Sequence, residues 1–192
     1  SRLSEGSVFL KKEECIDLPP KIFQIREYTM CKKQEEYYMD MVNNIRDNIN
    51  QWSKFEFTAK LMKLREILSG FVINKDGTIS EFKSNKTEVL KQAIEEIGDK
   101  PIIVWCQFQY EIETLTKEFD GVALTSKTKD RNQIIRDFKD GKIHLLFTHP
   151  KLLGKGLTFT NCTYNIYYSV SFSYEEFAQS QDRIHRIGQD NR

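Results

Sequence analysis

The chain has 192 residues, 39% of them apolar and 12% aromatic, a composition that can fill one sizeable core and excludes a disordered tail. Its 29 Lys and Arg residues nearly balance its 28 Asp and Glu residues, so an anionic partner must be met by a local patch of positive charge. No apolar run approaches the roughly 18 residues of a membrane span, and no leader indicates secretion, so we expect no membrane partner.

The first third of the chain predicts an extended segment followed by two helices. Residues 18–30, LPPKIFQIREYTM, are typical of an extended strand after a proline pair. A long polar helix is expected from Lys32 to Asn50. A second helix then follows from the spacing of apolar side chains between Phe57 and Leu68, and it ends at Gly70.

A β-hairpin and a further helix are expected next. Residues 71–82, FVINKDGTISEF, place an Asp76-Gly77 turn between two β-prone arms, which favours a hairpin. A helix is predicted from Thr87 to Ile97. We interpret residues 1–99 as an extension that packs against the rest of the chain.

Residues 100–192 predict an α/β core. Apolar runs rich in β-branched and aromatic residues alternate there with segments of helical period, and this alternation predicts a parallel sheet with helices on both faces. Ligands of such sheets bind beyond the carboxyl ends of the strands. His144, inside an apolar run, is expected to be a core histidine. The predicted strands are residues 101–108, 121–124, 142–150 and 164–172.

The cysteines do not predict a metal site. Cys15, Cys31, Cys106 and Cys162 lie far apart, with no Cys-x-x-Cys pair, so we interpret them as reduced thiols in a reducing compartment. The chain begins without methionine and stops four residues beyond Gly188, and we therefore expect a piece of a longer protein.

The stretch QSQDRIHRIGQ near the end carries the densest set of polar side chains. On a helix, a rotation of about 100° per residue places Gln179, Arg183 and Arg186 within about 60° of one another, with Phe177 on roughly the opposite side. One interpretation is a solvated helix end with favourable positive charge. The other is an anion site, because the guanidinium fork matches phosphate. Spacing alone leaves both open.

The pattern Q-x-x-D-R-x-H-R-I-G-Q resembles the last helicase motif of the Swi/Snf family of ATP-dependent DNA translocases. Upstream segments resemble the same family in the same order, and the hairpin after SGFV is most similar to its compact phage and bacterial members. These segments are LPPKIFQIREYTMCKKQEEYY, KPIIVWCQF, RNQIIRDFKDGKIHLLFTHP and GKGLTF. The resemblance implies the second RecA-like lobe of a two-lobe motor.

This resemblance implies roles on the nucleotide side. ATP and Mg²⁺ would be bound mainly by a first lobe of the same polypeptide, because this chain has no Walker A loop: Gly156, not Ser or Thr, follows Lys155. Arg183 and Arg186 would be the catalytic arginine fingers. The residues expected to bind nucleotide are Gln179, Asp182, Gly154 and Gly156.

The resemblance also implies contact with double-stranded DNA along the strand ends. Polar side chains there suit sequence-independent contact with phosphates. The expected residues are Gln107, Lys127, Thr128, Thr148, His149 and Lys151.

Two departures from the family pattern keep another function open. Thr158 replaces the usual asparagine of the glycine loop, and Phe172 begins Phe-Ser-Tyr where many relatives have Trp-Asn-Pro. The leading hypothesis is an ATP-dependent translocase, incomplete as this chain alone. The alternative is a RecA-like nucleic-acid- or protein-binding module without motor activity. The expected location is the cytoplasm of a bacterial or phage-infected cell, or the nucleus in a eukaryote.

Overall fold

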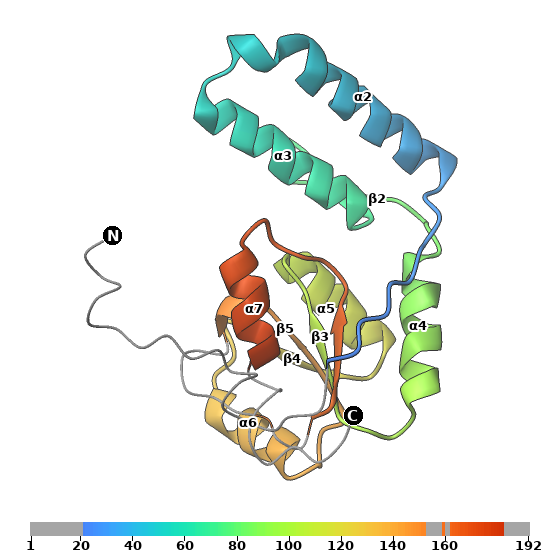
Figure 1. The fold of residues 1–192 in the computed structure, drawn as a ribbon, viewed down its shortest axis with the longest axis vertical. Helices are drawn as coiled ribbons and strands as arrows, with labels where there is room; N and C mark the ends of the chain where they lie inside the picture. The colour runs from blue at the N-terminus through green and yellow to red at the C-terminus, as the bar shows by residue number, and fades with distance from the viewer. Residues whose placement is uncertain (1–20, 153–158, 160–161, 183–192) are drawn as a thin grey trace, which may run out of the picture.

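The fold is described from a computed structural model that covers residues 21–152, 159 and 162–182 of the chain. Figure 1 shows two parts: an α/β body, and a pair of antiparallel helices that stands on one end of it. The sheet in the body has the strand order β4-β5-β3-β6, with all neighbouring strands parallel. The strands are β3 (Ile102–Trp105), β4 (Val122–Leu124), β5 (Leu145–Thr148) and β6 (Tyr164–Tyr167).

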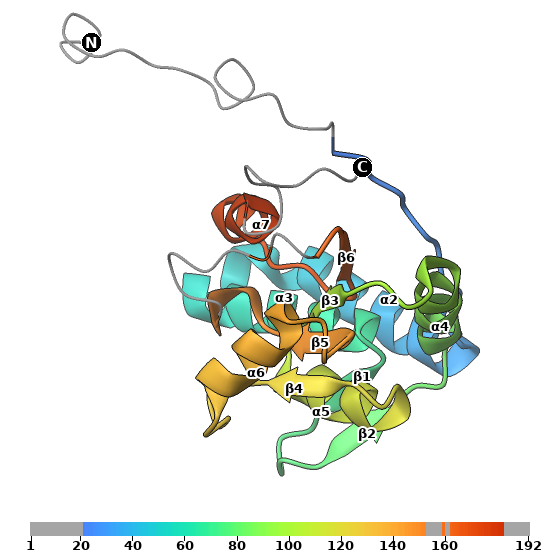
Figure 2. The same ribbon diagram turned by 90° about the horizontal axis from the view of Figure 1, so that it is seen from below.

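Helices cover both faces of this sheet, because alternate residues of each strand point to opposite sides. Ile103 and Trp105 pack on one face with α6 (Arg131–Lys139), while Ile102 and Val104 pack on the other with α4 (Lys86–Ile97) and α5 (Gln109–Glu118). The last described helix, α7 (Tyr174–Asp182), lies on the α6 side. Figure 2 shows the layers seen from below. The predicted RecA-like α/β fold is confirmed.

The helix pair consists of α2 (Lys32–Asn48) and α3 (Lys54–Leu68), joined through the 3₁₀ turn η1 (Ile49–Gln51). The helix α3 begins at a capping box, in which Ser53 Oγ accepts the Glu56 amide and the Glu56 carboxylate accepts the Ser53 amide. Its far end packs on the hairpin β1 (Phe71–Ile73) and β2 (Ile79–Glu81).

The hairpin was predicted correctly, including its turn. Gly77 has a φ of +84°, a left-handed conformation that favours glycine, and Asp76 Oδ1 accepts the Thr78 amide at 3.0 Å. Two expectations were wrong. Residues 21–30 form no strand and instead cross the body as an irregular segment, and His144 is exposed just before β5.

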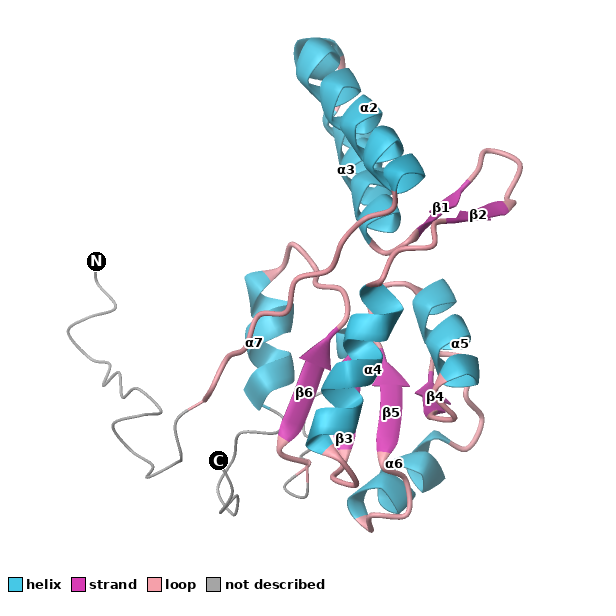
Figure 3. Cartoon of the chain, turned by 90° about the vertical axis from the view of Figure 1, so that its right-hand side faces the viewer, coloured by secondary structure: helices cyan, strands magenta, loops and turns pink. Residues whose placement is uncertain are grey.

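The orientation of the sheet decides what lies near its ligand-binding edge. In Figure 3 the strands β5 and β6 point toward the helix pair, and β3 is parallel to both, so the carboxyl ends of all three lie on that side of the body. The ring of Phe71 in β1 contacts the ring of Phe108, two residues past Cys106, at a centroid distance of 5.3 Å. The extension therefore borders the carboxyl edge of the sheet. The helix α4 lies within residues 1–99, the predicted extension, but it packs on the sheet. The domain boundary at residue 99 stays a prediction.

Candidate nucleotide and nucleic-acid site

The helix α7 is capped at its start and fixed to the sheet along its described length. Ser173 Oγ accepts the Glu176 amide at 3.2 Å and so caps the helix. The ring of Phe177 packs on Tyr167 of β6 at 4.8 Å between centroids. Phe177 thus lies on the sheet side of the helix, as its spacing predicts.

A hydrogen-bond chain adds to this anchorage. Ser180, only 1% exposed, donates to the Phe177 carbonyl at 2.7 Å, and its Oγ lies 2.6 Å from the Tyr167 hydroxyl. Because the serine proton is used in the first bond, Tyr167 is the donor in the second. Burial raises the pKa of Tyr167 to about 12, so the phenol stays protonated at neutral pH. The orientation of α7 on β6 is therefore fixed by a ring contact and a hydrogen bond.

The nucleotide-side residues fall only partly within the described structure. Gln179 is exposed on α7 and donates to Glu175 Oε1 at 2.8 Å. Asp182 ends the helix with its side chain half exposed, 3.5 Å from Lys21 Nζ. Arg183, Arg186, Gly154 and Gly156 lie outside the described residues. Their roles stay predictions.

The predicted nucleic-acid residues follow three parallel strands at the same edge. Gln107 comes after β3, and its backbone amide donates to Ser169 Oγ at 2.8 Å and to Glu111 Oε2 at 3.1 Å. Lys127 is exposed in the turn after β4, where Thr128 Oγ1 accepts the Thr125 amide. These side chains come from neighbouring loops of one edge because parallel strands end together.

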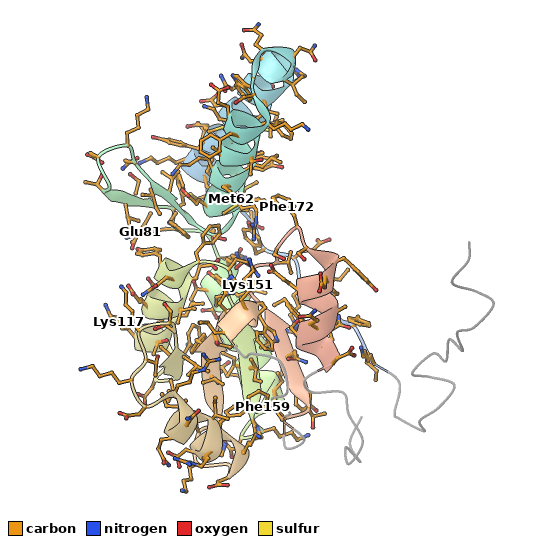
Figure 4. The ribbon with its side chains drawn as sticks, turned by 90° about the vertical axis from the view of Figure 1, so that its left-hand side faces the viewer. Met62, Glu81, Lys117, Lys151, Phe159 and Phe172 are labelled. Carbon is orange, nitrogen blue, oxygen red and sulfur yellow. The ribbon has the colours of Figure 1, made fainter. Side chains whose placement is uncertain are left out.

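Two further residues follow β5. The side chain of Lys151 is 68% exposed, and its Nζ lies 3.0 Å from Glu176 Oε1 of α7. Figure 4 labels Lys151 near the loop that precedes this helix. Partial burial lowers the pKa of His149, although the nearby Glu176 opposes the shift. His149 Nδ1 accepts the Lys151 amide at 3.1 Å, which fits a neutral imidazole.

Thr148 differs from the expectation. Its side chain is completely buried, and its hydroxyl donates to the Leu124 carbonyl at 3.0 Å. It links two strands and presents no group at the surface, so we leave it out of the proposed DNA surface. Sequence reasoning placed it at the edge because a strand end cannot be located to one residue from apolar pattern alone.

Sequence reasoning missed a buried carboxylate at the centre of this edge. Glu111 is 3% exposed, and its Oε2 accepts the amides of Gln107 and Phe108, each at 3.1 Å, and the hydroxyl of Ser169 at 2.6 Å. It therefore joins the loop after β3 to the loop after β6. The signal was a glutamate at the third position of a helix that starts directly after a strand.

A small hollow opens between these loops and α7. Pro150, Ser171 and Glu176 contribute to it, so its wall combines apolar surface with hydroxyl and carboxylate groups. The full set of lining residues is Gln107, Pro150, Tyr167, Val170, Ser171, Glu176 and Phe177.

The comparison with protein families identifies the domain. The model of the helicase conserved C-terminal domain matches residues 85–188. The chain belongs to this family. The helicase C-terminal domain therefore includes α4 and runs through the QSQDRIHRIGQ stretch, and the Swi/Snf-type resemblance is confirmed by the relatives of the domain.

Two curated proteins are similar to this helicase C-terminal domain. "Putative protein p41" of Acyrthosiphon pisum secondary endosymbiont phage 1 is 25% identical over 187 residues, covering 95% of the chain and 40% of the relative. A Caenorhabditis elegans protein is 23% identical over 174 residues, covering 84% of the chain and 17% of that protein. It is named as the homologue of a SWI/SNF-related, matrix-associated, actin-dependent regulator of chromatin containing DEAD/H box 1. The chain thus spans less than half of either relative.

A solved structure shares the fold. The Sulfolobus solfataricus SWI2/SNF2 ATPase core in complex with dsDNA aligns with a TM-score of 0.60 and 20% identity, covering 85% of the chain and 37% of that structure. In the described part of our chain, no helix is long and apolar enough to cross a membrane.

Proposed function

We propose that this chain is the second motor lobe of a DNA-dependent ATPase that couples hydrolysis to translocation on, or remodelling of, double-stranded DNA. The observation that carries the proposal is the fixed placement of α7. This helix is anchored to β6 through Tyr167 and Ser180 and ends at Asp182, one residue before Arg183. The family match through residue 188 supports placing the arginine motif directly after this helix.

The nucleotide half of the proposed mechanism depends on closure of two lobes. ATP and Mg²⁺, held mainly by a first lobe of the same polypeptide, would supply the phosphoryl group and the charge that activates it. Among residues 21–152, 159 and 162–182, no cluster of His, Cys, Asp or Glu is placed to hold a metal ion, so we assign no step to Mg²⁺ on these residues. Arg183 and Arg186 would stabilise the charge that develops on the γ-phosphoryl group, a contribution of about 10³ to 10⁵ in rate.

The other half of the proposed mechanism is contact with the DNA backbone. Gln107, Lys127, Thr128, His149 and Lys151 offer amide, hydroxyl, imidazole and ammonium groups at one sheet edge. Such groups position a protein on phosphates without reading sequence. The dsDNA in the similar Sulfolobus core supports a duplex as the ligand. Lys151 would have to exchange Glu176 for phosphate, which couples DNA binding to α7.

The decisive experiment is Arg183→Ala in the full-length protein. We expect DNA-stimulated ATP hydrolysis to fall by at least about 10³-fold while nucleotide binding is retained, because an arginine finger acts mainly on the transition state. Arg136→Ala is the matched control, since Arg136 is exposed on α6 and its guanidinium donates to Gln133 of the same helix. Unchanged turnover in Arg183→Ala would reject the arginine-finger role of Arg183, and duplex binding without hydrolysis in the wild type would reject the motor and favour the binding module.

A further inference from the structure

One side chain from the helix pair reaches the loop that leads into α7. Arg65 of α3 donates from Nη2 to the Val170 carbonyl at 2.6 Å. Val170 lies between β6 and α7, 105 residues further along the chain. This is a direct hydrogen bond between the extension and the loop that leads into α7.

The same guanidinium makes two ring contacts. Its carbon lies 4.9 Å from the centroid of Phe172 in that loop and 5.5 Å from the centroid of Phe108, in the loop after β3. Figure 4 labels Phe172 beside Met62, the neighbour of Arg65 on α3, where the helix pair meets the body. A cation over an aromatic face gains about 0.5–2 kcal/mol, depending on its desolvation. Arg65 therefore contacts the loop after β3 and the loop after β6 at once.

Two carboxylates near Arg65 favour its charged form. Burial lowers the pKa of Arg65, while attraction to Glu111 and Glu176 opposes the shift, and the guanidinium stays cationic at neutral pH. Glu111 fixes the loops after β3 and β6, and Glu176 is in the first turn of α7. Each segment that Arg65 contacts thus belongs to the candidate site rather than to a distant core.

We propose that Arg65 is a positioning residue, which sets the start of α7 and thereby couples the α2–α3 helix pair to the nucleotide side of the lobe. The inference deepens the proposed function, because its effect on turnover rests on α7 leading to the arginine fingers. Its structural part does not rest on that function. A tilt or shift of α3 would move the Val170 carbonyl and the Phe172 ring together, and both precede the helix cap at Ser173.

The contacts of Arg65 also bear on whether it contributes to the binding of ATP. Its Nη1 lies 3.4 Å from Met62 Sδ and its Nη2 is bonded to Val170. Arg65 is half-buried, and its guanidinium is bonded to these two residues of the same chain. We therefore expect its loss to change the rate of hydrolysis more than the binding of ATP.

The test compares Arg65→Gln, Arg65→Lys and the control Arg46→Gln in the full-length protein. Arg46 is on α2 of the same helix pair, its side chain is 71% exposed, and it bonds to Asp47. Arg65→Gln is expected to lower the DNA-stimulated kcat at least about 10-fold, with the KM for ATP changed less than about 2-fold. Arg65→Lys, which keeps the charge but loses the planar stack, should recover part of the rate, and Arg46→Gln should match the wild type.

Hydrogen exchange separates this proposal from the proposed function. In the same proteins, Arg65→Gln should speed exchange of the amides of residues 170–180 and leave those of β3 unchanged, whether or not the wild type hydrolyses ATP. A wild type without DNA-stimulated hydrolysis would reject the motor but leave this readout valid. Normal exchange in the loop together with normal kcat overturns the proposal. If Arg65→Gln fails to fold, Phe172→Ala, which removes one exposed ring partner, is expected to give the same exchange pattern and decides the outcome.

Discussion

Replacing Glu111 by glutamine tests the physical account of the sheet edge. The substitution keeps the shape of the side chain and removes its charge. In the wild type one carboxylate oxygen accepts three hydrogen bonds, from the amides of Gln107 and Phe108 and the hydroxyl of Ser169. An amide oxygen can accept from the same donors, so the change isolates the contribution of the charge.

The magnitude follows from the strength of these bonds. A hydrogen bond to a charged group contributes about 1.5–3 kcal/mol, and a neutral one about 0.5–1.5 kcal/mol, so three bonds lose roughly 3 kcal/mol together. A neutral side chain costs less to bury than a carboxylate, which offsets part of the loss, although the amide NH2 takes the place of the buried Oε1, which accepts no hydrogen bond from the described residues. We expect a net decrease of about 2–3 kcal/mol in the free energy of unfolding.

Equilibrium urea unfolding measures this change. With a slope of about 2 kcal/mol per molar urea, the midpoint should fall by roughly 1–1.5 M. Glu113→Gln is the matched control, because Glu113 is on the same helix, is exposed, and pairs with Gln109 at 2.7 Å. It should shift the stability by less than about 0.5 kcal/mol. A Glu111→Gln variant as stable as the control would refute the role assigned to the buried charge.

Two further predictions concern buried titrating groups. The pKa of Tyr167 is raised by burial to about 12, so its contribution to stability is complete below the unfolded value of about 10 and is lost as pH rises toward 12. Unfolding measured from pH 9 to 12 should therefore show a shallower decline for Tyr167→Phe than for the wild type, and parallel curves would contradict this assignment. Burial also raises the pKa of Cys162 to about 12, so iodoacetamide at pH 8 should modify it only after unfolding, because the thiolate is the reactive form. Peptide mapping that finds Cys162 modified in the folded protein would contradict its placement in the core.

Much of the fold could be predicted because it is encoded in local pattern. Apolar runs rich in β-branched and aromatic residues located the strands of the body, period-3.6 spacing located its helices, and Asp76-Gly77 located the hairpin turn. Within the predicted strand 18–30, the described residues 21–30 form no strand, because β-prone composition is only a preference. In the described part of that segment, the Thr29 amide donates to the Asn85 side chain instead of to a neighbouring strand.

The candidate site was predicted less completely than the fold. The polar residues at strand ends could be found, since parallel strands bring their carboxyl ends to one edge. The spacing of residues alone could not show that Arg65 and Glu111 both contact the loops after β3 and β6. The bond from Arg65 reaches a residue 105 positions away, and no periodic pattern encodes such a contact. The buried Thr148 shows the opposite error, since one position along a strand decides whether a side chain meets ligand or core.

The central claim is most directly tested by ATP hydrolysis measured with and without double-stranded DNA, on this chain alone and on the full-length protein. We predict hydrolysis only in the full-length protein, stimulated by duplex DNA, because the Walker A loop is absent from residues 1–192. A full-length protein that binds duplex DNA but does not hydrolyse ATP would contradict the motor account and leave a nucleic-acid-binding module in its place.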